Sequence, residues 1–80
     1  MNTSTSKSRE AIALDVRFDT STMSVPLQDG REIKVPLAWF PKLNQALPAQ
    51  RKRWRFIGKG VGIHWETLNE DLSVAALLGG

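Results

Sequence analysis

Apolar and polar residues alternate through the first half of the chain. Apolar side chains occupy every second position over residues 12–18, and the same period of two recurs over 23–27 and 33–37. This period is typical of strands with one buried face. Asp29-Gly30 lies between the second and third runs and indicates a tight hairpin, because glycine accepts a positive φ at little cost. The pattern therefore predicts a three-stranded antiparallel meander with one apolar face.

The segment LAWFPKLNQAL (37–47) changes to a helical period. Its apolar residues at helical spacing are Trp39, Leu43, Ala46 and Leu47. We expect a helix that covers the meander, with Trp39 in the core. Pro41 suits the first turn of this helix, where a missing N–H costs nothing. Pro48 ends the helix and is well placed to begin a second short one in PAQRKRW.

The last third predicts extended structure and then a short helix. Residues 55–65 are interpreted as a strand, a kink relaxed by glycines and a further extended segment. LSVAALL (72–78) predicts a helix capped by Asp71 or Ser73 and ended by Gly79-Gly80. The expected fold class is α+β: a three-stranded antiparallel meander covered by one or two short helices, then a Gly-rich strand and a short C-terminal helix. Residues 11–80 form a single small domain behind a disordered tail, residues 1–10.

Length and composition narrow the class of protein. Eighty residues make one domain at most, with a small core. The absence of cysteine excludes disulfides and thiolate metal sites, and fits a reducing compartment. No apolar run approaches the roughly 20 residues that a membrane span needs, and the polar first ten residues lack the apolar centre of a signal peptide. We expect a cytoplasmic protein that does not enter a membrane.

The charge is unevenly distributed although the net charge is only +3. Six cations lie in an acid-free segment: Lys42, Arg51, Lys52, Arg53, Arg55 and Lys59. Only acids follow: Glu66, Glu70 and Asp71. This asymmetry favours an anionic partner or complementary pairing with a protein, including a second copy of the chain. The alternative is a solvated basic surface that is only a local feature of the sequence.

Gly58, Gly60 and Gly62 alternate within GKGVGIHW (58–65). Such glycines can expose N–H groups to a phosphate, with Lys59 as the counter-charge. Phosphate loops, however, place their glycines between a strand and the start of a helix, and here an extended segment follows. The favoured interpretation is a bulge or kink where the backbone approaches a neighbour closely.

His64 is the only histidine of the chain. Catalysis would require a nucleophile or an orienting acid within hydrogen-bond reach, and Ser73 is the best nearby hydroxyl. A serine that caps a helix is a poor nucleophile, and a metal site of His64 with Glu66 and Asp71 would be short of ligands. We expect no catalytic residue, no metal and no cofactor. His64 is expected to face away from Ile63 and Trp65 and to bond a local carboxylate or carbonyl.

The aromatic and basic residues suggest a contact surface. Trp54 lies inside RKRWR (51–55), a pattern that suits stacking on nucleic acid and equally suits an anchor whose ring points inward. Trp65 is equally suited to a buried and to an exposed position. The predicted partner-binding residues are Arg51, Arg53, Trp54, Arg55, His64 and Trp65. The expected function is a non-catalytic protein-interaction or regulatory module that binds a second protein or forms a homodimer. The alternative is nucleic-acid binding through residues 51–55.

Four motifs in order resemble the domain-of-unknown-function family two-four-four-two of short bacterial proteins. They are DGREIKVPLAWFPKL (29–43), Arg51, IGKGVGIHW (57–65) and EDLSVAALLG (70–79). The resemblance covers nearly the whole chain after the first ten residues. It implies a small α+β domain without an established activity, in a regulatory setting and, for some members, beside a second short protein in a toxin–antitoxin-like pair. Glu66 and Asn69 depart from the family pattern, which commonly has a proline and an acid there.

Overall fold

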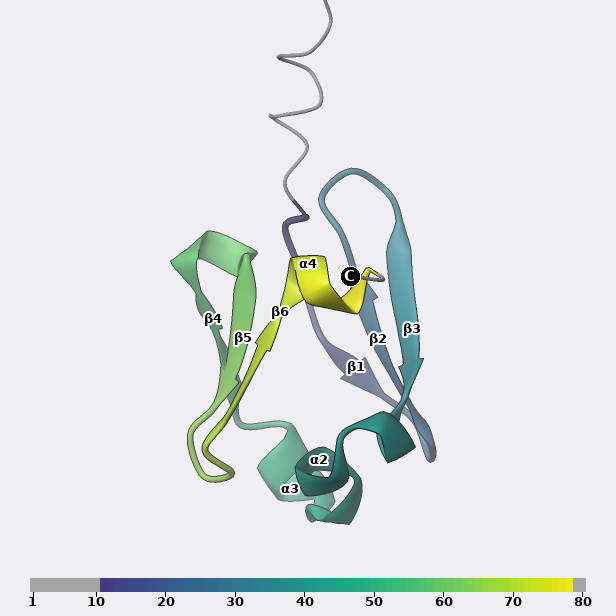
Figure 1. Ribbon diagram of the computed structural model, residues 1–80, viewed down its shortest axis with the longest axis vertical. Coiled ribbons are helices and arrows are strands. Elements are labelled where there is room, and N and C mark those ends of the chain that lie inside the picture. Colours follow the sequence, from purple (N-terminus) through teal and green to yellow (C-terminus); the bar gives the residue numbers. More distant parts are fainter. Residues whose placement is uncertain (1–10, 79–80) are drawn as a thin grey trace, which may run out of the picture.

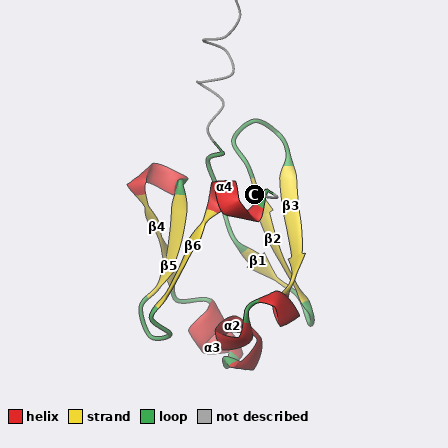
Figure 2. Cartoon of the chain, viewed as in Figure 1, coloured by secondary structure: helices red, strands yellow, loops and turns green. Residues whose placement is uncertain are grey.

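The computed structural model describes residues 11–78. The predicted tail, residues 1–10, and the predicted helix stop at Gly79-Gly80 lie outside the described residues. Two antiparallel three-stranded sheets lie side by side, with the order β1-β2-β3 in the first and β4-β5-β6 in the second (Figure 1). Short helices lie at both ends of the space between them (Figure 2). The α+β class is confirmed.

The first sheet is the predicted meander. It contains β1 (Arg17–Phe18), β2 (Thr22–Pro26) and β3 (Glu32–Pro36). The register pairs Met23 with Val35 and Val25 with Ile33, and all four side chains are buried. The turn between β2 and β3 contains Gly30 at φ 96°, as the Asp29-Gly30 signal predicts.

The predicted facing of the first strand is wrong at Leu14 and correct at Val16. Ala13 and Val16 are buried, whereas Leu14 is 58% exposed. Ala13 is paired with Leu27, and Arg17 is paired with Ser24. The first segment therefore advances four residues between these pairs while its partner advances three. This one-residue bulge moves the following side chains to the opposite face and breaks the alternation. Pro26 lies opposite the bulge, and its carbonyl accepts from the Leu14 N–H at 2.9 Å.

The helix predicted over residues 37–47 is divided into the 3-10 turn η1 (Leu37–Trp39) and the helix α2 (Pro41–Gln45). The predicted second short helix is present as α3 (Pro48–Arg51). Pro41 and Pro48 each occupy the first turn of their helix, as predicted. Gln50 compensates for the missing polar cap residue of α3, because its side-chain oxygen accepts from the Leu47 N–H at 2.9 Å.

The second sheet contains β4 (Trp54–Ile57), β5 (Gly62–Trp65) and β6 (Glu70–Ser73), with the 3-10 turn η2 (Gly58–Gly60) between β4 and β5. The sequence predicts the first two strands but not β6. The C-terminal helix α4 (Val74–Leu77) is shorter than expected, and Ser73 rather than Asp71 caps it, accepting from the Ala76 N–H at 3.3 Å.

The core lies between the sheets and is shared by both. The first sheet and its flanking segments contribute most of the buried side chains, and α2, β5 and α4 contribute Leu43, Ile63, Trp65 and Val74. The meander is therefore covered by the second sheet as well as by short helices. The outer face of the second sheet and the surface at the ends of the core remain exposed and are the places to look for a functional site.

Candidate functional site

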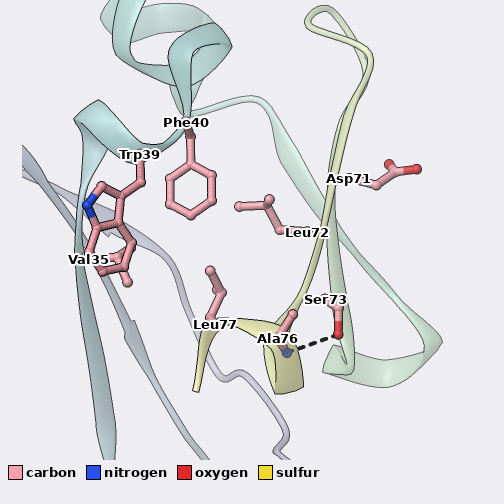
Figure 3. Close-up of a pocket in the computed structure, with 8 residues that line it drawn as sticks. All are labelled: Val35, Trp39, Phe40, Asp71, Leu72, Ser73, Ala76 and Leu77. Atoms are coloured by element: carbon pink, nitrogen blue, oxygen red, sulfur yellow. Dashed lines mark hydrogen bonds between the residues drawn. The ribbon is translucent and has the colours of Figure 1, made fainter. Parts of the chain in front are cut away.

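An apolar groove of about 600 Å³ lies between the two sheets, bounded by β3 and β6. η1 and the start of α2 close one end, and α4 closes the other (Figure 3). Its lining residues are Val35, Trp39, Phe40, Asp71, Leu72, Ser73, Ala76 and Leu77. Asp71 points away from the aromatic rings, while Leu72 and Leu77 point toward Phe40. The groove is therefore mainly hydrophobic, with Asp71 and Ser73 as its polar lining residues.

Trp39 is the most exposed aromatic residue of the groove. It is 67% exposed, so the prediction that it belongs to the core is wrong. Helical spacing with Leu43 requires one continuous helix, but Phe40 adopts φ −127° and ψ 86° and interrupts it. Leu43 alone then points into the core. An indole left largely in water beside a hydrophobic groove is typical of a contact residue.

Arg51 and Trp65 belong to the framework rather than to an exposed surface. Trp65 is fully buried, and its Nε1–H donates to the Arg51 carbonyl at 2.9 Å. The Arg51 guanidinium donates to the carbonyls of Leu43 and Asn44 at 2.8 and 2.9 Å. These bonds help to satisfy the carbonyls in the last turn of α2, where the Leu43 carbonyl also accepts from the Ala46 N–H. A partner cannot reach the Trp65 ring in this conformation, so we remove Trp65 from the predicted partner-binding set.

The remaining basic residues of that set are Arg55 on β4 and Arg53, which immediately precedes it. Arg53 and Arg55 are exposed, whereas Trp54 between them is half-buried. The Trp54 ring packs on Phe56 with 4.9 Å between ring centroids. This is the inward-pointing anchor considered from the sequence, with the arginines left in solvent. The predicted residues that share an accessible surface are therefore Arg53, Arg55 and, on the next strand, His64.

His64 lies on the outer face of the second sheet, in one row with Arg55 on β4 and Asp71 on β6. Its Nδ1 contacts the Asp71 carboxylate, as expected from the sequence. The Ser73 hydroxyl is engaged at the start of α4. Within residues 11–78, no three histidine or acidic side chains gather in a way that could hold a metal ion.

The glycine segment is a close-approach turn. Gly60 has φ 106°, and its carbonyl accepts from the Ala13 N–H at 2.8 Å. A Cβ at Gly60 would lie 2.8 Å from the Ala13 oxygen. The favoured interpretation from the sequence is confirmed. Lys59 also adopts a positive φ, 65°, within this turn.

The carboxyl groups with shifted pKa values in the described chain lie in turns, away from the groove and from β4. The Thr22 hydroxyl, together with the N–H groups of Ser21 and Thr22, lowers the pKa of Asp19 between β1 and β2. The Arg31 side chain likewise lowers the pKa of Asp29 in the β2–β3 turn. These carboxylates stabilise the hairpins and are not candidates for chemistry.

Sequence reasoning missed the groove itself. Phe40, Leu72 and Leu77 line it, and none was singled out from the sequence. The groove forms only because β6 is present and because the helix is interrupted at Phe40. β6 has four residues, and a strand this short shows no clear alternation in sequence. The adjacent aromatic pair before Pro41 was the available signal, because a proline at a helix start leaves the preceding residues outside the helix.

None of the helices in residues 11–78 has the length and apolar character to cross a membrane.

Two solved structures share this fold. A crystal structure of a protein of unknown function from Rhodospirillum rubrum is 32% identical, with a TM-score of 0.76, and the match covers 90% of this chain and 89% of that one. A solution NMR structure of an uncharacterized protein from Chromobacterium violaceum is 23% identical, with a TM-score of 0.74 and coverage of 94% and 71%. The second likeness shows the fold alone.

No curated protein matches the chain. A family model described as "Protein of unknown function (DUF2442)" matches residues 13–80. The match includes the four motifs that carry the resemblance in the sequence. The chain therefore belongs to the DUF2442 family.

Proposed function

We propose that this chain is a non-catalytic protein-interaction module with a regulatory role, and that the apolar groove receives part of a partner protein. The observation that carries the proposal is Trp39, which is 67% exposed at the edge of a groove lined by Phe40, Leu72 and Leu77. Tryptophan is enriched among the residues that dominate binding energy at protein interfaces. A contiguous exposed apolar surface on a domain this small is also typical of an interaction site.

The polar residues support a non-catalytic role. His64 has an orienting acid in Asp71, but the candidate nucleophile Ser73 uses its hydroxyl to cap α4. A nucleophile must share a hydrogen bond with its base, and in the described chain no such bond joins Ser73 to His64. Binding accounts for the groove without any reaction.

The family resemblance supports a particular partner. Some members occur beside a second short protein, so a co-encoded protein in a toxin–antitoxin-like pair, in the cytoplasm, is the partner that we propose. A homodimer is the other outcome of the test. Either partner would bury the Trp39 ring and displace water from the groove.

The test is a pull-down of the tagged chain from its native lysate, with and without nuclease. Trp39→Ala is compared with Leu47→Ala, because Leu47 is similarly exposed, at 65%, and does not line the groove. We expect a stoichiometric protein that survives nuclease, is lost with Trp39→Ala and is retained with Leu47→Ala. Circular dichroism checks that both variants fold. Equal retention by both variants would contradict the groove as the contact.

Nucleic-acid binding is the second candidate, favoured by Lys52, Arg53, Arg55 and Lys59 around β4. It predicts that the logarithm of the affinity falls with the logarithm of salt concentration by about 0.9 per phosphate contact. Its weakness is Trp54, whose ring packs on Phe56 and is not free to stack on a base. Recovery that disappears with nuclease would favour this candidate over the protein partner.

A further inference from the structure

β4 is an edge strand of the second sheet. The Val74 N–H donates to the Val61 carbonyl, so Val61, Ile63 and Trp65 direct their main-chain groups toward β6. In an antiparallel sheet the intervening residues of the central strand bond to the other neighbour. Gly62 and His64 therefore bond to β4, where their register partners are Ile57 and Arg55.

Trp54 and Phe56 consequently direct their N–H and C=O groups away from the sheet. Within residues 11–78, no loop or side-chain group forms a hydrogen bond with these main-chain groups. An edge of this kind is a template for another extended segment. The side chains alternate across it, with Arg55 on the outer face and the half-buried Trp54 and Phe56 on the inner one.

Four cations that lack an ion pair lie on and around the same strand, whereas on the first sheet only the single Lys34 of β3 lacks one within residues 11–78. Elsewhere in the described chain Arg17, Arg31 and Lys42 contact carboxylates, and the Arg51 guanidinium is held by carbonyls. Across residues 11–78, no ion pair forms with the four cations on and around β4: Lys52, Arg53, Arg55 and Lys59. Their positive potential is directed to solvent at an open strand edge.

This charge disfavours a second copy as the occupant of the edge. Two copies joined through β4 about a two-fold axis would bring the arginines of one strand close to those of the other. Like charges directly opposite in a sheet are destabilising. An extended segment of opposite charge meets no such repulsion and neutralises the arginines.

We propose that the β4 edge binds an extended acidic segment of a partner protein by adding it to the second sheet as a further strand. Main-chain groups of Trp54 and Phe56 hold the segment, and its Asp or Glu side chains on the outer face pair with Arg55 and Arg53. Apolar residues at the alternate positions cover Trp54 and Phe56. The inference rests on the proposed function only in requiring that the chain binds protein, since it uses a different surface from the groove.

The test uses the full chain and two short synthetic peptides, one alternating glutamate with valine and one alternating lysine with valine. Binding is followed by NMR, with amide hydrogen exchange of Trp54 and Phe56 as the site-specific readout. We expect the acidic peptide to slow exchange at these two amides and the basic peptide to leave it unchanged. Arg55→Glu should weaken binding of the acidic peptide roughly tenfold or more. Lys34→Glu, the same charge change at an exposed position of β3, should leave it unaffected.

Unchanged exchange at Trp54 and Phe56 with the acidic peptide present, or equal binding of both peptides, would overturn the inference. Tighter binding of a short single-stranded oligonucleotide at the same amides would also overturn it, in favour of nucleic acid. The groove is tested separately by Trp39→Ala. A partner that is lost with Trp39→Ala but retained with Arg55→Glu would leave the proposed function standing without the edge-strand contact.

Discussion

The indole Nε1–H of Trp65 donates to the main-chain carbonyl of Arg51 at 2.9 Å. Trp65 lies in the centre of the core on β5, and Arg51 ends α3. The bond therefore ties the second sheet to the helical end of the molecule. The guanidinium of the same arginine holds the last carbonyls of α2, so one residue of the basic segment joins three elements.

Trp65→Phe should lower the free energy of unfolding. The Arg51 carbonyl loses its donor inside the protein, which costs roughly 1–3 kcal/mol, and the smaller ring leaves unfilled volume. Trp54→Phe is the matched control, because Trp54 is half-buried on the edge strand and should lose less. Urea unfolding followed by circular dichroism measures both. Equal losses for the two variants would show that the hydrogen bond to Arg51 contributes little.

Gly60→Ala should be clearly more destabilising than Gly30→Ala. Both glycines have positive φ, 106° and 96°, and an L-residue there costs roughly 1–2 kcal/mol. A Cβ at Gly30 meets no atom within 4 Å, whereas at Gly60 it lies 2.8 Å from the Ala13 oxygen. Forcing this contact adds about 1–3 kcal/mol. Denaturant midpoints compare the two variants, and a Gly60→Ala loss no larger than that of Gly30→Ala would contradict the close approach.

Asp19 should titrate below its ordinary pKa of 3.8. The Thr22 hydroxyl donates to its carboxylate at 2.7 Å, and the Ser21 and Thr22 N–H groups donate at 3.0 and 2.8 Å. A lowered folded pKa means that the ionised group stabilises the fold above the unfolded value, and that this stabilisation is lost as pH falls through the folded pKa.

An NMR titration of the Asp19 carboxyl carbon measures this pKa directly. Thr22→Val is the control, because it removes the hydroxyl and keeps a β-branched side chain in β2. The Asp19 pKa should then rise toward 3.8. A wild-type value at or above 3.8 would contradict the hydrogen-bonded turn.

The sequence predicts those parts of the fold that depend on local chemistry. Alternation over Met23–Leu27 and Ile33–Leu37, the hairpin at Gly30 and the helix starts at Pro41 and Pro48 all follow from the residues themselves. The features of the fold that the sequence did not predict depend on tertiary contacts. The bulge before Arg17 accompanies two contacts of Ala13, a pairing with Leu27 just after β2 and a hydrogen bond to Gly60. Nothing local to residues 12–18 indicates the extra residue.

The sequence predicted only those residues of the candidate surfaces that lie close together in the chain. Arg53 and Arg55 are recognisable as an accessible basic pair because they are close in sequence, at and just before the start of β4. The groove brings Trp39, from the middle of the chain, together with Leu77 near its C-terminal end, so no short sequence window contains it. Trp65 and Arg51 were assigned to the surface because aromatic and basic residues suit interfaces and frameworks equally well, and only their mutual contact distinguishes the two.

The strand order of both sheets bears on how quickly the chain folds. Every pairing among β1 to β6 joins strands that follow one another directly in the chain, so each sheet assembles by closing short loops. Domains dominated by such short-range pairings fold faster than those that must first join distant segments. The hydrogen bond from Ala13 to Gly60 links opposite halves of the chain. We therefore expect two rapidly formed halves whose docking, secured at Gly60, is the slow step.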